Sequence, residues 1–153
     1  MLHWYPSRSL LAAIRAWQSA SGPLAPFRRV VAKWRHRIWS IVTGADIPLD
    51  CDLGGGLLLP HPNGIVIAPG ASIGPNCLLF QQVTIGSDGR GVPTLEGHVD
   101  VGAGAKLLGP IRIGEHARIG ANAVVVTDVP AYATAVGVPA KITAGAKRSD
   151  PAG

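Results

Sequence analysis

The sequence predicts an all-β solenoid preceded by a short α-helical segment, and three observations carry this prediction. A six-residue pattern repeats over most of the chain from Ile47 onward. Glycine and proline are frequent, at 20 and 13 of 153 residues, whereas aromatic residues make up 5%, which suits a fold with many short turns. All four tryptophans and seven basic residues, but no acidic residue, precede Asp46, so the chain has two unlike parts.

The first part, residues 1–44, contains two amphipathic patterns. The stretch "SRSLLAAIRAWQS" predicts a short helix and "PFRRVVAKWRHRIWSIV" a longer one, with Gly22, Pro23 and Pro26 between them. One stripe of the longer helix is apolar, and it consists of Phe27, Val30, Val31, Trp34, Ile38 and Ile41.

Two interpretations of these helices stay open. A helical pair can cap the first coil of a solenoid, whose strand edges would otherwise be unpaired. A basic helix that carries tryptophan is also typical of segments that lie on anionic membranes. No apolar run approaches the length of a membrane span, so we expect a cytoplasmic protein, with peripheral contact at the inner membrane face as the second hypothesis. The rest of the chain has seven basic and nine acidic residues, a net charge of 7 − 9 = −2, and no nucleic-acid-binding motif, so we expect no nucleic-acid partner.

The repeated hexads begin with an aliphatic residue, often have glycine second, and usually have a small or β-branched residue fifth. The register slips by two residues before Ile67, is interrupted by a loop after Ile85, and then runs on to Val136. The aliphatic first positions are Ile47, Leu53, Leu59, Ile67, Ile73, Leu79, Ile85, Leu95, Val101, Leu107, Ile113, Ile119 and Val125, and Ala131 is expected to follow. A short fixed period of this kind indicates a solenoid.

Each hexad is expected to form one short strand and one corner, with the first residue pointing inward. Three sides then close a coil of 18 residues, and each strand pairs with the one above it at about 4.8 Å. The pattern resembles the left-handed parallel β-helix, and it predicts four to five coils. We therefore expect a helical segment at 1–44, a β-helix domain at 45–142 and a flexible tail at 143–153.

The two cysteines, Cys51 and Cys77, both occupy fifth positions of hexads. A small buried side chain is required there, and a buried cysteine behaves as a small hydrophobe. Their spacing does not match a metal site. We expect both to be reduced core residues.

His61 is the first candidate for chemistry, because it stands between Pro60 and Pro62 in the stretch "LLLPHPNGIVIAPG". The two prolines fix the path of the backbone around the imidazole. Asp46 precedes His61 by fifteen residues, nearly one coil, so the two should return to one corner at neighbouring levels. An aspartate there can hold one ring nitrogen and leave the other free. The residues alone also allow a histidine that merely tolerates a tight turn.

Longer motifs extend this signal over about two-thirds of the chain. They are "ADI", then "H..GIVI" fifteen residues later, "QQVTIG" before the loop, "VGAGAKLLGPIRIGEHARIGANAVVV" and the closing "VPAYATAVGVPAKI". This region resembles the catalytic domain of bacterial serine acetyltransferases and of the related exopolysaccharide O-acetyltransferases, within the hexapeptide acyltransferase superfamily. The resemblance implies an acetyl-CoA-dependent O-acetyltransferase in which His61 is the general base and Asp46 orients it. No metal and no covalent cysteine intermediate are expected.

The acceptor side departs from the serine acetyltransferase pattern. That family has an aspartate where this chain has Pro60, and an Arg-His pair where this chain has Gly91-Val92 in a shorter loop. These groups hold the amino and carboxylate groups of serine in the family, and a zwitterion without its counter-charges loses orientation energy. The departures favour a sugar or exopolysaccharide hydroxyl as acceptor, with serine O-acetylation in cysteine biosynthesis as the alternative.

The acetyl-CoA side matches the family better. The resemblance implies that Ala103, Gly104 and Ala121 line the pantetheine arm, that Arg118 meets a CoA phosphate, and that Gly137 and Lys141 shape the adenine end. Small residues allow a close approach of the backbone to the arm. Plain β-helix packing explains the same glycines and alanines equally well.

The resemblance also implies a homotrimer with active sites between subunits, in which the loop at 86–93 reaches across the boundary. Two other functions were weighed. Carbonic anhydrase-like zinc chemistry requires three converging histidines; His98 and His116 lie one coil apart at one corner, but no third histidine stands at a suitable spacing. A non-catalytic scaffold is disfavoured because the Asp46–His61 spacing is intact.

Overall fold

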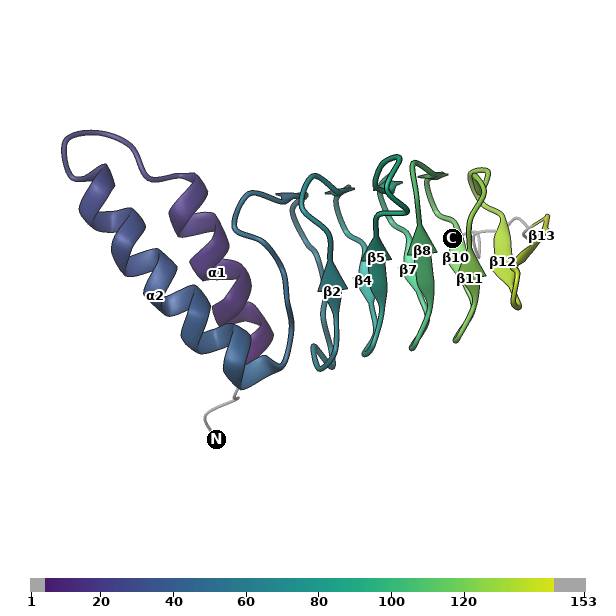
Figure 1. The fold of residues 1–153 in the computed structure, drawn as a ribbon, viewed down its shortest axis with the longest axis horizontal. Helices are drawn as coiled ribbons and strands as arrows, with labels where there is room; N and C mark the ends of the chain where they lie inside the picture. Colours follow the sequence, from purple (N-terminus) through teal and green to yellow (C-terminus); the bar gives the residue numbers. More distant parts are fainter. Residues whose placement is uncertain (1–4, 145–153) are drawn as a thin grey trace, which may run out of the picture.

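The computed structural model describes residues 5–144, which form a helical hairpin followed by a β-solenoid (Figure 1). Helix α1 (Pro6–Gln18) and helix α2 (Ala25–Thr43) lie side by side at one end. Helix α2 ends at Gly44, which takes a left-handed conformation with φ of 66° and lets the chain turn into the first coil. The expected tail, from residue 145 on, lies outside the described residues.

The solenoid has three sides, each a sheet of short strands. Side A consists of β2 (Val66–Ile67), β5 (Thr84–Gly86), β8 (Lys106–Leu108) and β11 (Val124–Val125). Side B consists of β1 (Asp52–Leu53), β3 (Ser72–Ile73), β6 (Thr94–Leu95) and β9 (Arg112–Ile113). Side C consists of β4 (Leu78–Leu79), β7 (Asp100–Val101), β10 (Arg118–Ile119), β12 (Thr134–Val136) and β13 (Lys141–Thr143). Neighbouring strands are parallel except β12 and β13, where the chain folds back, and the predicted left-handed parallel β-helix is confirmed.

The pairing gives the length of each coil. Asp52 pairs with Ser72, so the first coil has 72 − 52 = 20 residues and contains the predicted two-residue slip. Thr84 pairs with Lys106, and this coil of 106 − 84 = 22 residues contains the loop between β5 and β6. Coils between these lengths follow the expected 18, as in 84 − 66 from Val66 to Thr84.

The predicted register is wrong in the last coil. Ile113 pairs with Val129, so this coil has 129 − 113 = 16 residues and its corner is two residues short. Val129 points inward and is buried, whereas Ala131, the expected inward residue, is exposed. The physical reason is that the larger aliphatic side chain fills the interior better than alanine does. Ala135 accordingly moves from a fifth position to a first position, opposite Ile119.

The core is a column of aliphatic first-position residues with small fifth-position residues beside them. Cys51 and Cys77 are fully buried in this column, as predicted. Burial raises the pKa of the Cys51 thiol to about 11, and the nearby Asp50 and Asp46 carboxylates raise it further. Burial also raises the pKa of Cys77. Both side chains are therefore neutral packing groups at neutral pH.

Helix α1 covers the open first coil. Leu10, Leu11 and Ile14 belong to the same buried cluster as the solenoid interior. At the rim, Arg15 donates a hydrogen bond to the carbonyl of Gly54 (3.1 Å), and the Gln18 amide donates to the carbonyl of Cys51 (2.8 Å). The capping interpretation holds for α1.

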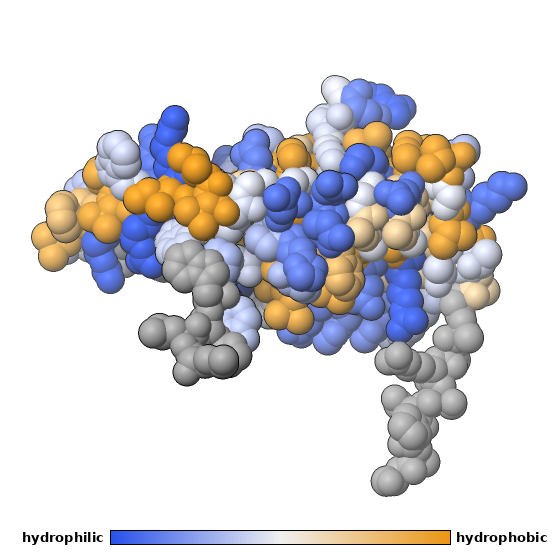
Figure 2. Space-filling model, turned by 90° about the horizontal axis from the view of Figure 1, so that it is seen from below, coloured by the Kyte–Doolittle hydropathy of each residue, from blue (hydrophilic) through white to orange (hydrophobic). Residues whose placement is uncertain are grey.

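Helix α2 packs on α1 and presents its apolar stripe outward. His36 donates from Nε2 to the carbonyl of Ile47 (2.8 Å), and Trp39 packs against the core from the same inner face. The predicted stripe is exposed instead, with Phe27 at 70%, Trp34 at 66% and Ile41 at 77%. Figure 2 shows apolar side chains gathered at the helical end of the molecule. Among the described residues, neither helix has the length and hydropathy that crossing a bilayer requires.

Candidate active site

His61 lies in the turn between sides C and A, after the first coil. Leu58 pairs with Leu78 on side C just before this turn, and β2 of side A follows it. The side chain is exposed. Pro60 and Pro62 restrict the backbone on both sides, as the sequence indicates.

Asp46 lies at the same corner, one level nearer the helices. The N–H of Gly64 donates to the carbonyl of Gly44, and the N–H of Asp46 donates to the carbonyl of Ile65, both at 2.8 Å. These bonds hold the histidine turn over the segment that enters the solenoid. Asp46 itself pairs with Val66, the residue that opens β2, so its exposed side chain stands on the outer surface of side A.

The two side chains come to one corner without bonding to each other. Within residues 5–144, no hydrogen bond or ion pair joins Asp46 and His61. Their mutual placement is fixed by backbone hydrogen bonds. A small side-chain rotation is required for the carboxylate to meet the imidazole.

The predicted cofactor residues stack above His61 along the same edge. We call this the histidine edge; it comprises residues 61–64, 81–82, 103–104, 121–122 and 137. Successive levels are joined by backbone hydrogen bonds from Gln82 to Asn63 (2.9 Å), from Gly104 to Gln81 (2.9 Å), and from Asn122 to Ala103 (2.8 Å). Farther along, the N–H of Val124 donates to the carbonyl of Gly137 (3.0 Å). Ala103, Gly104, Ala121 and Gly137 therefore lie in line with His61.

Arg118 and Lys141 lie on side C near the far end of this edge. Arg118 is on β10 and pairs with Thr134 of β12, and Lys141 of β13 pairs with Val136 of the same strand. Both side chains are exposed. Arg118 Nε lies 3.9 Å from Asp100 Oδ2, a weak exposed pair that leaves the guanidinium available to a phosphate.

Gly104 is explained by the fold alone. Its φ is +74°, and a Cβ there would lie 2.2 Å from Oδ1 of Asn122. The left-handed backbone and the close neighbour both require glycine. Its presence in the sequence therefore does not by itself identify a ligand contact.

Gln81 is a candidate that sequence reasoning missed. Its Oε1 is buried and has no hydrogen-bond partner among the described residues. Its backbone carbonyl accepts from Gly104, which places it between the His61 turn and the predicted pantetheine contacts. A buried amide oxygen without a donor is costly, so it is suited to accept a hydrogen bond from a bound molecule. The "QQVTIG" motif contained this residue, but no feature of the sequence distinguished it from a packing residue.

The loop between β5 and β6 carries an internal ion pair. The Arg90 side chain donates two hydrogen bonds to Oδ2 of Asp88, at 2.8 and 2.5 Å, and these bonds hold the pKa of that carboxyl below its usual range. The side chain of Arg90 is 81% exposed. The loop therefore presents a guanidinium to the outside although it lacks an Arg-His pair.

Comparison with solved structures defines the class of the protein. A serine acetyltransferase in complex with CoA superposes with a TM-score of 0.79 at 34% identity, over 93% of this chain and 59% of that one. The Neisseria gonorrhoeae serine acetyltransferase in complex with serine gives a TM-score of 0.73 at 37% identity, over 89% and 54%. The fold is that of the hexapeptide-repeat acyltransferases.

Sequence comparison then gives the family. The serine acetyltransferase of Helicobacter pylori strain J99 is 41% identical over 115 residues, which are 72% of this chain and 67% of that protein. The Synechococcus elongatus enzyme is 42% identical over 117 residues, covering 74% and 48%. The chain belongs to the serine acetyltransferase family. It spans about half the length of the first relatives it matches, and no family profile matches it.

Proposed function

We propose that the protein is an acetyl-CoA-dependent O-acetyltransferase and that its acceptor is serine. The single observation that carries the proposal is the alignment of His61 with the predicted pantetheine residues along one edge of the β-helix. Family membership, a relative solved with CoA and a relative solved with serine support it.

In this mechanism, Nε2 of His61 takes the proton from the acceptor hydroxyl as the oxygen attacks the thioester carbonyl of acetyl-CoA. The C–S bond then breaks, and the CoA sulfur leaves as a thiol with the proton that His61 returns. Asp46 orients the ring and supports its positive charge. Backbone N–H groups at the edge are suited to the transient oxyanion.

The proposed path of acetyl-CoA follows the histidine edge away from the helices. The pantetheine arm would run past Ala103, Gly104, Ala121 and Gly137, and the cations of Arg118 and Lys141 would meet phosphate groups. Gln81 lies between this path and His61. Its free amide oxygen would accept a hydrogen bond from the arm or from the acceptor.

The choice of serine reverses the preference drawn from the sequence. That preference rested on Pro60 and on Gly91-Val92, where the family has charged groups. The relatives named above are all serine acetyltransferases, and the exposed Arg90 offers a guanidinium one residue before the missing pair. A guanidinium binds a carboxylate well, so the clamp for an amino acid would be altered rather than lost.

An acceptor screen tests the proposal. CoA release from acetyl-CoA is followed with serine, with nucleotide sugars and with lipid-linked saccharides in parallel. Serine should give the highest kcat/KM. Turnover with a saccharide and none with serine would restore the sugar acceptor, and the absence of acetyl-CoA binding would favour a scaffold.

We further propose a homotrimer whose active sites lie between subunits, with the loop at 86–93 contributing from the neighbour. Arg90 would then reach the acceptor of the adjacent subunit, which explains why its own chain provides only Asp88 as a partner. The solved relatives of this fold support such an assembly.

We also propose that α2 lies on an anionic membrane surface. Its exposed stripe has no cover among the described residues, and Arg28, Arg29, Lys33, Arg35 and Arg37 accompany it on the same helix. Apolar side chains next to clustered basic ones match an anionic lipid surface in both hydrophobicity and charge.

A further inference from the structure

A second group of reactive side chains lies on another edge of the solenoid, between sides B and C. Its corner residues stack from coil to coil: Asn76, His98, His116 and Tyr132. The rings of His98 and His116 are 4.6 Å apart between centroids and nearly parallel, and the Tyr132 ring continues the stack 4.9 Å beyond His116. The sequence predicted the histidine pair but found no third partner for it.

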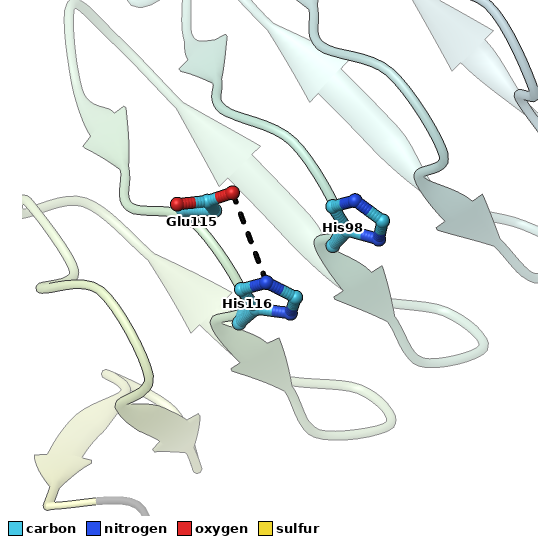
Figure 3. A group of neighbouring side chains, drawn as sticks. All are labelled: His98, Glu115 and His116. Carbon is cyan, nitrogen blue, oxygen red and sulfur yellow. Dashed lines mark ion pairs between the residues drawn. The ribbon is translucent and has the colours of Figure 1, made fainter.

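The structure supplies Glu115 as that partner. One ligand atom from each of His98, Glu115 and His116 lies within 4.8 Å of the other two, and Glu115 Oε1 is 3.7 Å from His116 Nε2. Figure 3 shows the two imidazoles side by side on neighbouring coils with the carboxylate next to them. No other ion pair engages the Glu115 carboxylate in the described part of the chain.

The backbone holds these three residues in place. His98 donates its N–H to the carbonyl of Pro75 (2.8 Å) and His116 donates to Gly97 (3.1 Å), so each is tied to the coil below. The N–H of Glu115 donates to Oε2 of Glu96 (2.8 Å), and its carbonyl accepts from Tyr132 (2.8 Å). Glu96 is itself bound by Arg112, so that acid is already satisfied. The ligand set is thus fixed at the backbone and free at the side chains.

We propose that His98, Glu115 and His116 bind a divalent transition-metal ion of the zinc class. Two imidazoles and one carboxylate are a known zinc donor set, with bonds of about 2.0–2.2 Å. In a tetrahedral site these bonds put ligand atoms about 3.4 Å apart, slightly closer than they lie here, and rotation of the exposed side chains closes the difference. A fourth position is left for water. The site is on a different edge from His61 and does not depend on the acetyl-transfer proposal.

A fold-only explanation competes with this one, because stacked rings can simply stabilise the corner. His98 and His116 have φ of 59° and 57°, a region in which asparagine and histidine are both enriched. Asn76 and Asn122 occupy such corners elsewhere in the chain. Asparagine is therefore a substitution that the backbone accepts and that removes the imidazole.

The test is a calorimetric titration of the full chain with Zn²⁺ after chelator treatment and dialysis, with Mg²⁺ as the control ion. One Zn²⁺ should bind per chain at this site. His98→Asn and His116→Asn should each weaken binding at least tenfold, because losing even an outer partner of a metal ligand costs about that much. Glu115→Gln should weaken it as well, and His61→Ala should leave it unchanged.

Two results would overturn the proposal. One is unaltered Zn²⁺ affinity in the double variant His98→Asn, His116→Asn, which would place the ion elsewhere. The other is no uptake by the wild-type chain even at millimolar Zn²⁺. As a readout that needs no variant, Zn²⁺ should shift the ring NMR signals of His98 and His116 and leave those of His61 in place.

Discussion

The N–H of Gly64 donates to the carbonyl of Gly44 at 2.8 Å, and this bond ties the turn of His61 to the segment that carries Asp46. The proposed base and its partner are therefore placed by the first turn of the solenoid, before any ligand binds. Acetyl transfer should depend on both side chains but folding should not, because both are exposed.

His61→Ala is expected to lower kcat by at least ~10²-fold, as for the loss of a general base, with acetyl-CoA affinity nearly unchanged. Asp46→Asn should give a smaller loss, because the ring loses its orientation and its charge support. Steady-state kinetics and a CoA-binding isotherm measure the two quantities. Most of the turnover surviving in His61→Ala would show that the base is another residue.

Arg90 should matter for a serine acceptor and not for acetyl-CoA. Arg90→Ala is expected to raise the KM for serine about tenfold or more, the cost of one hydrogen bond to a charged group, with the KM for acetyl-CoA unchanged. Arg90→Lys should recover part of the loss, since lysine keeps the charge but not the paired geometry. An unchanged serine KM in Arg90→Ala would remove this residue from acceptor recognition.

The hexads predicted the solenoid well because an inward aliphatic residue is required at every side of every coil. Corner length is signalled more weakly: the short last corner moved Val129 inward, and only burial shows it. Periodicity also gave α2 an apolar face without saying what covers it. Likewise, the 18-residue spacing of His98 and His116 predicted their stacking, but Glu115 joins them through the path of the turn, which no spacing rule describes.

The assembly can be tested by light scattering at micromolar concentration. A mass three times that of the chain, which is 15.8 kDa, is expected. Mixing two inactive variants should also restore activity if the sites are shared: His61→Ala and Arg90→Ala together would form some sites with both residues intact. A monomeric mass at full activity would contradict a site built between subunits.

Alkaline pH should destabilise the protein through Cys51. Its pKa is raised to about 11 in the fold from 9.0, so above pH 9.0 the unfolded chain loses a proton that the folded chain keeps, and stability falls as pH rises. Cys51→Ala preserves a residue type found at equivalent buried positions, such as Ala71 and Ala105. Denaturant unfolding at pH 7.5 and 10 should show a smaller loss in this variant. Other groups that titrate in the range are common to both proteins, so an equal loss would rule out the thiol.

The exposed stripe of α2 leads to a prediction about membranes. Basic residues near an anionic surface contribute about 1 kcal/mol each, and a trimer would present three such helices together, so weak contacts would add. The protein should co-sediment with vesicles that contain phosphatidylserine at low salt, and less at high salt. Trp34→Gln with Ile41→Gln should reduce binding, whereas Val126→Gln, an equally polar change on the solenoid at an exposed apolar residue, should not. No sedimentation at low salt would refute membrane docking, and self-association lost in the Trp34→Gln, Ile41→Gln variant would assign the stripe to a second copy of the chain instead.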